Sequence, residues 1–140
     1  WKFVTFHHPV YSTAKGRDNA KIRDAWQPIL QKYGVDLVLQ GHDHAYGRKN
    51  VPTGVTTRDR DAGPVYVVSV SGPKMYPLGE GVKTEMTSTA ENTQLYQIIS
   101  VDGNRLTYEA RTVVGHVHDA FELIKGANGK NRLVQKTPKR

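Results

Sequence analysis

Two histidine-containing segments each follow a short apolar run, and this repeated arrangement limits the folds open to the chain. The first is FHHPVYS, from Phe6 to Ser12, and the second is GHDHAYGR, from Gly41 to Arg48. The runs before them, WKFVTF and VDLVLQ, are typical of strands, and the residues between them have helical spacing. A strand, a helix and a strand within about 40 residues predict a right-handed βαβ unit with parallel strands. Both segments then leave the carboxyl edge of the sheet, where α/β sheets bind ligands.

The intervening helix is expected over about residues 18–33. Asp18 is the expected N-cap, Pro28 should kink or restart the helix, and Gly34 suits the position after its end. An apolar stripe at helical spacing should lie buried against the sheet: Ile22, Trp26, Ile29, Leu30 and Tyr33. Replacing Trp26 with Ala is therefore expected to cost about 3–5 kcal/mol of stability.

The rest of the chain predicts strands. A polar loop should run from Lys49 to Pro64, a strand from Val65 to Val70, and irregular structure through the Gly- and Pro-rich stretch that follows. From Thr93 onward the pattern is typical of an antiparallel meander with a turn at Asp102-Gly103. Residues 126–140 should form an edge strand or a disordered basic tail. The fold class is thus α/β, with one βαβ unit followed by an antiparallel meander in a single domain.

Composition excludes several function classes. The 140 residues contain no cysteine, so disulfides, thiolate metal sites and a cysteine nucleophile are excluded. No apolar run reaches the roughly 20 residues that span a bilayer, and we expect no membrane partner. The net charge is +7, but much of the excess lies in the C-terminal tail. We interpret that tail as solvated and expect no nucleic-acid partner.

The histidines have the spacing of metal ligands. In an extended strand end, His42 and His44 would point the same way and Asp43 the opposite way. Neutral imidazole is a common ligand of zinc, iron and manganese, and His7 comes from the neighbouring strand. The three histidines therefore predict a metal site, and the alternative is a surface loop that carries histidines.

These segments resemble a known family. FHHPVYS followed by VDLVLQGHDHAYGR is similar to the last two motifs of the calcineurin-like metallophosphoesterases, and more closely to their purple acid phosphatase branch. The resemblance covers about residues 1–76 and implies the C-terminal half of a metallophosphoesterase-type α/β sandwich. It implies two divalent or trivalent metal ions (Fe, Zn or Mn). His7 and His42 would bind one and His44 the other, as the catalytic residues.

The resemblance also suggests substrate contacts. His8 should face away from the metal, where it either reaches the substrate or forms a hydrogen bond under the loop. Lys15 and Arg17 stand in a loop where plant members carry histidines, and they either bind phosphate or face water. Tyr46 and Arg48 either position phosphate or hold the loop.

The carboxylate motifs of the family are absent from this sequence. Asp-x-His, Gly-Asp and Gly-Asn-His precede the histidine segments in that family, so residues 1–140 are expected to be the C-terminal part of a catalytic domain. The expected function is hydrolysis of small phosphate esters by a two-metal site that a missing N-terminal half completes. The isolated chain should self-associate, bind metal weakly or not at all, and be inactive. The alternatives are a phosphodiesterase or nuclease and a non-catalytic binding domain, and the resemblance favours an exported protein, periplasmic or extracellular.

A second Gly-His-x-His, Gly115 to His118, has the same spacing in a different context. It follows a meander strand and runs directly into another alternating segment. We interpret it as a turn or an exposed strand face.

Overall fold

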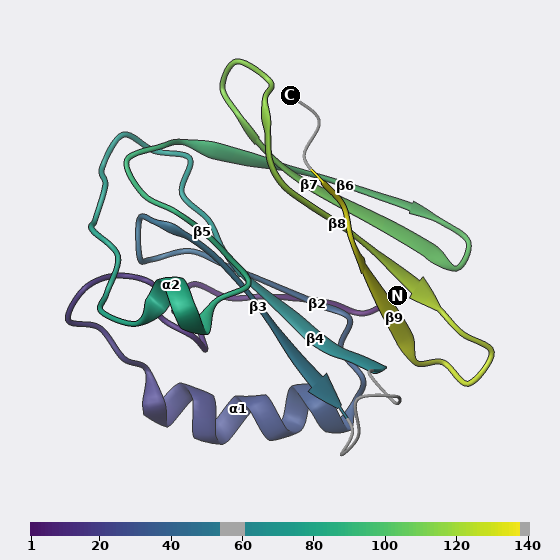
Figure 1. The fold of residues 1–140 in the computed structure, drawn as a ribbon. Helices are drawn as coiled ribbons and strands as arrows, with labels where there is room; N and C mark the ends of the chain where they lie inside the picture. Colours follow the sequence, from purple (N-terminus) through teal and green to yellow (C-terminus); the bar gives the residue numbers. More distant parts are fainter. Residues whose placement is uncertain (54–60, 138–140) are drawn as a thin grey trace.

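The parallel part of the sheet is built as the sequence predicts. In a computed structural model, which describes residues 1–53 and 61–137, strand β1 (Phe3–Thr5) is followed by helix α1 (Ala20–Lys32) and strand β2 (Leu37–Gln40). β1 and β2 pair in parallel, with Phe3 opposite Leu37. Helix α1 connects the two strands in the chain and lies along one face of the sheet (Figure 1). The predicted βαβ unit is confirmed.

Two further strands complete this part of the sheet. Strand β4 (Asp61–Val68) is parallel to β2, and β3 (Tyr46–Thr53) is antiparallel to β4. The polar loop expected from Lys49 to Pro64 is therefore wrong over residues 49–53, which extend β3, and over residues 61–64, which begin β4. Its central part, residues 54–60, lies outside the described residues.

The second half is a meander, as expected. After the short helix α2 (Val82–Glu85) and strand β5 (Ser88–Ala90), four antiparallel strands follow in chain order: β6 (Leu95–Asp102), β7 (Arg105–Thr112), β8 (Val117–Lys125) and β9 (Asn131–Gln135). The strand order is β1-β2-β4-β9-β8-β7-β6. Within residues 126–140, expected to be an edge strand or a disordered tail, the described part includes the strand β9. It pairs with β8 along its length and with β4 at Asn131.

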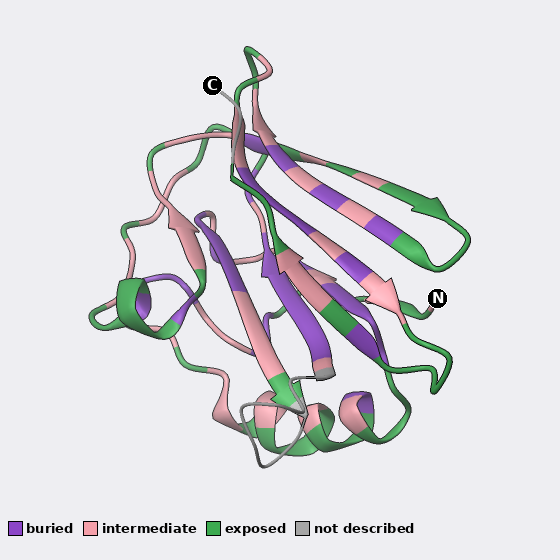
Figure 2. Cartoon of the chain, turned by 45° about the vertical axis from the view of Figure 1, so that its right-hand side comes forward, coloured by how far each residue is buried: buried purple, intermediate pink, exposed green. Residues whose placement is uncertain are grey.

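Strands β2 and β4 are covered on both faces, and successive side chains point to opposite sides. On one face, Leu37 and Val65 pack against the meander; on the other, Val38 and Tyr66 pack with Leu30 of α1. Figure 2 shows the buried residues concentrated in the central strands, with buried and less buried residues alternating along the meander. Within the described residues, neither helix is long and apolar enough to cross a membrane.

The ends of α1 differ from the prediction. The N-cap is Asn19 rather than Asp18, and the Asp18 carboxylate instead accepts a hydrogen bond from Arg23 at 2.7 Å. Pro28 lies inside a helix that runs from Ala20 to Lys32 without a restart. Gly34 has φ +58, the left-handed conformation that its expected position after the helix end favours.

The buried stripe of α1 is narrower than predicted. Leu30 is buried and Ile22 is partly buried in the same cluster, but Trp26, Ile29 and Tyr33 are 47%, 56% and 60% exposed. The helix is rotated so that Leu30 meets the sheet. Trp26 lies beside β1, where its ring contacts Phe6 at a centroid distance of 4.8 Å. The expectation that this whole stripe packs on the sheet is wrong.

This rotation lowers the cost expected for Trp26→Ala and makes Leu30→Ala the more damaging substitution. Leu30→Ala should lower the free energy of unfolding by about 2–5 kcal/mol, because it leaves a cavity in a packed cluster. Trp26→Ala should cost only about 1 kcal/mol, since the half-exposed ring leaves no enclosed cavity. Urea unfolding of both variants measures the difference. A larger loss for Trp26→Ala than for Leu30→Ala would contradict this helix orientation.

Candidate functional site

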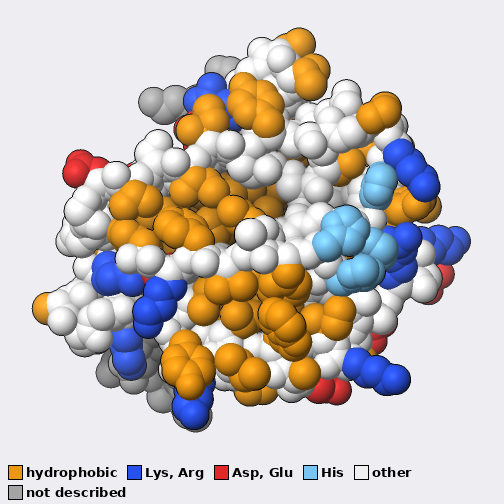
Figure 3. Space-filling model, turned by 180° about the vertical axis from the view of Figure 1, so that it is seen from behind, with side chains coloured by type: hydrophobic (Ala, Val, Ile, Leu, Met, Phe, Trp, Pro, Cys, Tyr) orange, Lys and Arg blue, Asp and Glu red, His pale blue; other side chains and the backbone are white. Residues whose placement is uncertain are grey.

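The parallel pairing of β1 and β2 brings the two histidine segments to one edge of the sheet. The Gly41 N–H donates to the His7 carbonyl at 3.1 Å, so the two loops stay together after the strands end. His7 Nε2 and His42 Nδ1 are 3.1 Å apart, and the ring centroids of His8 and His42 are 4.0 Å apart. Figure 3 shows the histidines gathered at one side of the molecule, with Lys and Arg side chains beside them and hydrophobic surface nearby. Three imidazoles therefore form one exposed group.

This environment favours neutral imidazole at His42. Partial burial lowers the pKa of His42, and the positive charges of His8, Arg17 and His7 lower it further against the opposing effect of Asp43. A neutral ring offers a lone pair to a cation.

The second histidine segment is not extended, which corrects the predicted geometry. His42 and His44 have φ +72 and +52, a left-handed conformation that non-glycine residues seldom adopt. Between them the Asp43 carboxylate is turned inward and is fully buried. It accepts hydrogen bonds from the backbone N–H groups of Thr13 and Ala14 at 2.5 and 3.3 Å. Asp43 does point away from the histidines, but it does so in a tight turn that its own hydrogen bonds hold.

His44 has a separate environment. Its Nδ1 lies 2.9 Å from the Lys74 carbonyl oxygen, and its ring contacts Tyr76 at a centroid distance of 4.8 Å. Because a carbonyl can only accept, Nδ1 must carry the proton. In the tautomer that this contact selects, the lone pair is on Nε2, as in metal-binding histidines held by a backbone carbonyl.

The two basic residues of the first loop point to different places. The Arg17 Nη1 donates to the His42 carbonyl at 3.0 Å and to Asp43 Oδ1 at 3.2 Å, so Arg17 lies beside the histidines. The Lys15 side chain lines a separate hollow with Glu80 and Glu91. Of the two, only Arg17 is in contact with the histidine segment.

The nitrogen atoms of His7 and His42 suit a shared metal ion. Tetrahedral zinc holds its nitrogen ligands at about 2.0–2.1 Å, which places two of them about 3.3 Å apart. The observed 3.1 Å is close to that separation. Among residues 1–53 and 61–137, however, no group of three or more His, Cys, Asp or Glu side chains is placed to hold a metal. The described residues thus supply nitrogen ligands in part of the geometry, and no carboxylate among them completes it.

Comparison with known proteins agrees with this arrangement. Residues 1–46, which include His7 and His42, match the family model described as calcineurin-like phosphoesterase. The chain is a relative of the calcineurin-like phosphoesterases.

Its similarity points to the purple acid phosphatase-like branch of the calcineurin-like phosphoesterases. Purple acid phosphatase 15 of Arabidopsis thaliana is 39% identical over 75 residues, 51% of this chain and 14% of that protein. An acid phosphatase of Aspergillus ficuum is 25% identical over 126 residues, 90% of this chain and 16% of that protein. Acid phosphatase A of Cryphonectria parasitica is 26% identical over 135 residues, 89% of this chain and 27% of that protein. The chain spans much less than half the length of these curated relatives.

The side chains of Tyr46 and Arg48 lie in the interior of the protein. Arg48 is fully buried and makes a two-pronged ion pair with Asp119 of β8, at 2.6 and 3.0 Å. The Tyr46 hydroxyl donates to the same carboxylate at 2.8 Å, and Gln135 accepts from Arg48 at 2.6 Å. These contacts favour the loop-holding alternative for both residues.

The second Gly-His-x-His lies at the turn between β7 and β8. Gly115 has φ +88 and His116 is exposed, while the His118 Nε2 lies 3.1 Å from the Thr89 carbonyl. These two histidines do not form a metal-holding group among the described residues.

Sequence reasoning missed several residues around the site. The alternation of residues predicts that Asp43 points away from the histidines, but it does not predict the contact of Asp43 with the first loop. Gly47 permits that contact, because a Cβ there would lie 2.2 Å from Thr13 Cγ2. Lys74 and Tyr76 come from a stretch whose Gly and Pro content predicts only irregular structure, and no spacing marked them.

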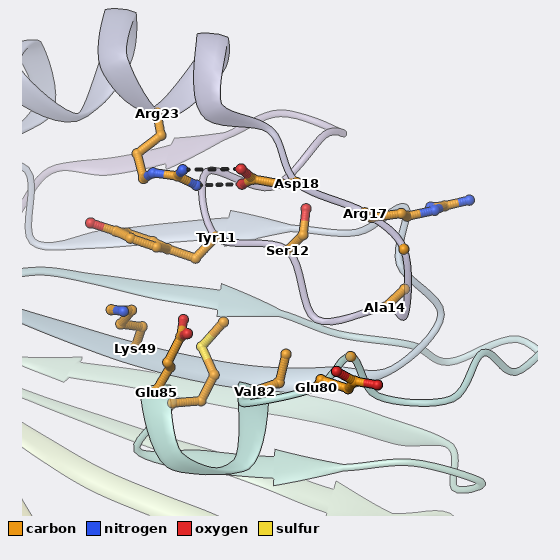
Figure 4. A pocket seen from close by; sticks show the side chains of 13 residues that line it. Tyr11, Ser12, Ala14, Arg17, Asp18, Arg23, Lys49, Glu80, Val82 and Glu85 are labelled. Atoms are coloured by element: carbon orange, nitrogen blue, oxygen red, sulfur yellow. Dashed lines mark hydrogen bonds and ion pairs between the residues drawn. The ribbon is translucent and has the colours of Figure 1, made fainter.

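A hollow of about 560 Å³ adjoins the first loop (Figure 4). Arg23 is paired with Asp18 on one wall, Lys49 and Glu85 come from the other, and the Arg17 side chain points away from the hollow. The lining carries three cations and three carboxylates: Arg17, Arg23, Lys49, Asp18, Glu80 and Glu85. This balance gives the hollow no preference for anions.

The buried Arg48–Asp119 pair makes a testable prediction. Burial raises the pKa of Asp119, but the hydrogen bonds and charge of Arg48, with those of Tyr46 and Gln135, outweigh it and hold the pKa below its usual value. Asp119→Asn should cost about 3–5 kcal/mol at pH 7, because Arg48 is left buried without its partner. A double variant, Arg48→Met with Asp119→Leu, should recover most of that loss.

The pH dependence follows from the lowered pKa. The contribution of Asp119 is present above the unfolded-state pKa of about 3.9 and is lost as the pH falls through the lower folded pKa. The gap between wild type and Asp119→Asn should therefore narrow below about pH 4. Urea unfolding between pH 7 and 2 measures it, and a constant gap would show that Asp119 does not carry the charge.

Proposed function

We propose that this chain forms the histidine-bearing part of a site that hydrolyses phosphate esters. The observation that carries the proposal is the approach of His7 Nε2 to His42 Nδ1, 3.1 Å at the carboxyl edge of a parallel sheet. Similarity to acid phosphatases supports the chemistry at the level of the family. His7 and His42 would bind one metal ion (Fe, Zn or Mn) and His44 Nε2 a second.

The metal ions, when bound, would act as Lewis acids that stabilise charge on the phosphoryl oxygens. The chain's own residues orient and bind. The Lys74 carbonyl keeps the His44 proton on Nδ1, and Asp43 holds the turn that separates His42 from His44. Arg17 supplies a fixed positive charge next to His42. The exposed His8 ring lies against the His42 ring, within reach of a substrate.

We further propose that carboxylates from a preceding segment of a longer protein complete the site. Two like-charged cations a few Å apart repel each other, and imidazoles carry no charge to compensate for this repulsion. The short span of the chain relative to its relatives supports this proposal. So does the position of β1, which ends the described sheet with one side unpaired. Export to the periplasm or the exterior remains a prediction from the resemblance.

The ligand set is tested in the longer protein. Each of the variants His42→Asn and His44→Asn should lose the bound metal, and its phosphatase activity should fall at least about a hundredfold. Asparagine tolerates the left-handed backbone of both positions, so the fold should persist. His116→Asn, at an exposed histidine of the second Gly-His-x-His, is the matched control. Metal analysis and turnover measure the outcome, and loss of metal in the control alone would mean that the wrong pair was chosen.

A substrate panel separates the activities that this ligand set serves. Monoesters, diesters and nucleic acid should be compared on the same protein. Hydrolysis of diesters or nucleic acid alone would identify a phosphodiesterase or nuclease. Metal binding with no turnover on any of them would identify a binding domain.

The exposed apolar surface predicts self-association of the isolated chain. Four apolar side chains on β1, on α1 and at the C-cap of α1 are at least 45% exposed: Phe3, Trp26, Ile29 and Tyr33. An apolar face of this kind seldom stays open on a monomer, so we propose a two-fold dimer through it. Light scattering at several concentrations should show a dimer that Trp26→Glu weakens and that Val113→Glu, at an exposed hairpin tip, does not. A monomer with substantial phosphatase turnover would contradict both the dimer and the need for a further segment.

A further inference from the structure

Two cations converge on one phenol next to His44. The Arg17 guanidinium carbon lies 4.8 Å from the centroid of the Tyr76 ring, and the Lys74 ammonium lies 5.2 Å from it. The same ring contacts His44 at 4.8 Å. A phenol hydroxyl, a guanidinium and an ammonium, all hydrogen-bond donors, therefore lie together at the edge of the candidate site.

This group is held in place although its segment has no regular structure. The Tyr76 N–H donates to the His44 carbonyl at 3.2 Å, and the Lys74 carbonyl holds the His44 ring. The segment is also bonded to the first loop. The Lys15 N–H donates to the Pro77 carbonyl and the Gly79 N–H to the Thr13 carbonyl, both at 2.9 Å.

The charge of the group is not balanced. Lys74 is exposed and makes no ion pair with a carboxylate among the described residues. Among the described residues Arg17 has one carboxylate partner, Asp43, but that carboxylate is fully buried and also binds the N–H groups of Thr13 and Ala14. The hollow of Figure 4 is different, because its cations and carboxylates are equal in number. Of the two neighbouring surfaces, the group at Tyr76 is the one that attracts an anion.

We propose that Arg17, Lys74 and Tyr76 form a subsite for a second phosphate group of the substrate, distinct from the phosphate that is hydrolysed. The subsite lies on the His44 side of the histidine group, outside the approach between His7 and His42. Guanidinium and ammonium groups make charge-assisted hydrogen bonds to phosphate oxygens, and the phenol adds a neutral donor. The site thus selects bisphosphates over monophosphates. The role of this subsite in hydrolysis rests on the proposed function, whereas the binding of an anion there does not.

Binding to the chain without metal tests the subsite first. Propanediol bisphosphate and propyl phosphate differ by one phosphate, and each can be titrated into the 140-residue chain by NMR. Each ligand should bind and shift the signals of Tyr76 and Lys74, because without metal the subsite can take the phosphate group of either one. Lys74→Met should weaken the bisphosphate about tenfold, and Tyr76→Phe, which keeps the ring against His44, about threefold.

The control is Lys21→Met, at an exposed lysine on α1. Equal weakening by Lys21→Met and Lys74→Met would show non-specific attraction to a basic protein and overturn the subsite. So would titrations in which neither ligand shifts the signals of Tyr76 and Lys74.

Turnover in the longer protein tests the role. The ratio of kcat/KM for propanediol bisphosphate to that for propyl phosphate should fall about tenfold in Lys74→Met. An unchanged ratio would overturn the selectivity. If neither ester is hydrolysed but the binding contrast holds, the proposed function fails and the anion subsite stands.

Discussion

The inward turn of Asp43 is the interaction on which the histidine site depends. A buried carboxylate must be bonded, and this one accepts from two backbone N–H groups of the first loop and from Arg17. To reach them, the chain adopts a left-handed conformation at both flanking residues, His42 and His44. Such strain persists only where surrounding contacts impose it. One carboxylate thus sets the directions of two histidines and ties them to the loop that begins at His7.

A second buried carboxylate anchors the same strand to the rest of the molecule. Asp119 of β8 binds Arg48 and Tyr46 of β3, only a few residues after His44. Burial raises the pKa of Tyr46, so its hydroxyl keeps the proton that it donates. The meander therefore fixes the position of β3 through a polar network inside the apolar core. The edge that carries the histidines is thus held by two buried acids, Asp43 and Asp119.

The sequence predicts what periodicity and strand context determine. The βαβ unit and the meander follow from apolar spacing, and the meeting of His7 with His42 follows from parallel strands that end together. Local geometry was less accessible. The rotation of α1, which buries Leu30 and exposes Trp26, depends on the tertiary packing of Leu30 with Val38 and Tyr66. The left-handed turn at His42 depends on a loop 30 residues earlier, which no local pattern encodes.

One signal was present in the sequence and could have been used. Asp119 alternates with Phe121 and Leu123, which places an acid on the buried face of β8 and calls for a buried cation. Arg48 lies on the same face of β3 as Tyr46, and it meets that requirement. Lys74 and Tyr76 had no such signal, because Gly- and Pro-rich segments have no periodicity that assigns a face.

Imidazole nitrogen NMR of the longer protein during a zinc titration tests the histidine site most directly. The geometry predicts that His7 Nε2 and His42 Nδ1 shift together as zinc is added, while His44 keeps its proton on Nδ1 throughout. The signals of His116 and His118 should not move. Zinc that perturbs His116 and His118 first, or that leaves His7 and His42 unchanged at saturation, would contradict the assignment of this sheet edge as a metal-binding site.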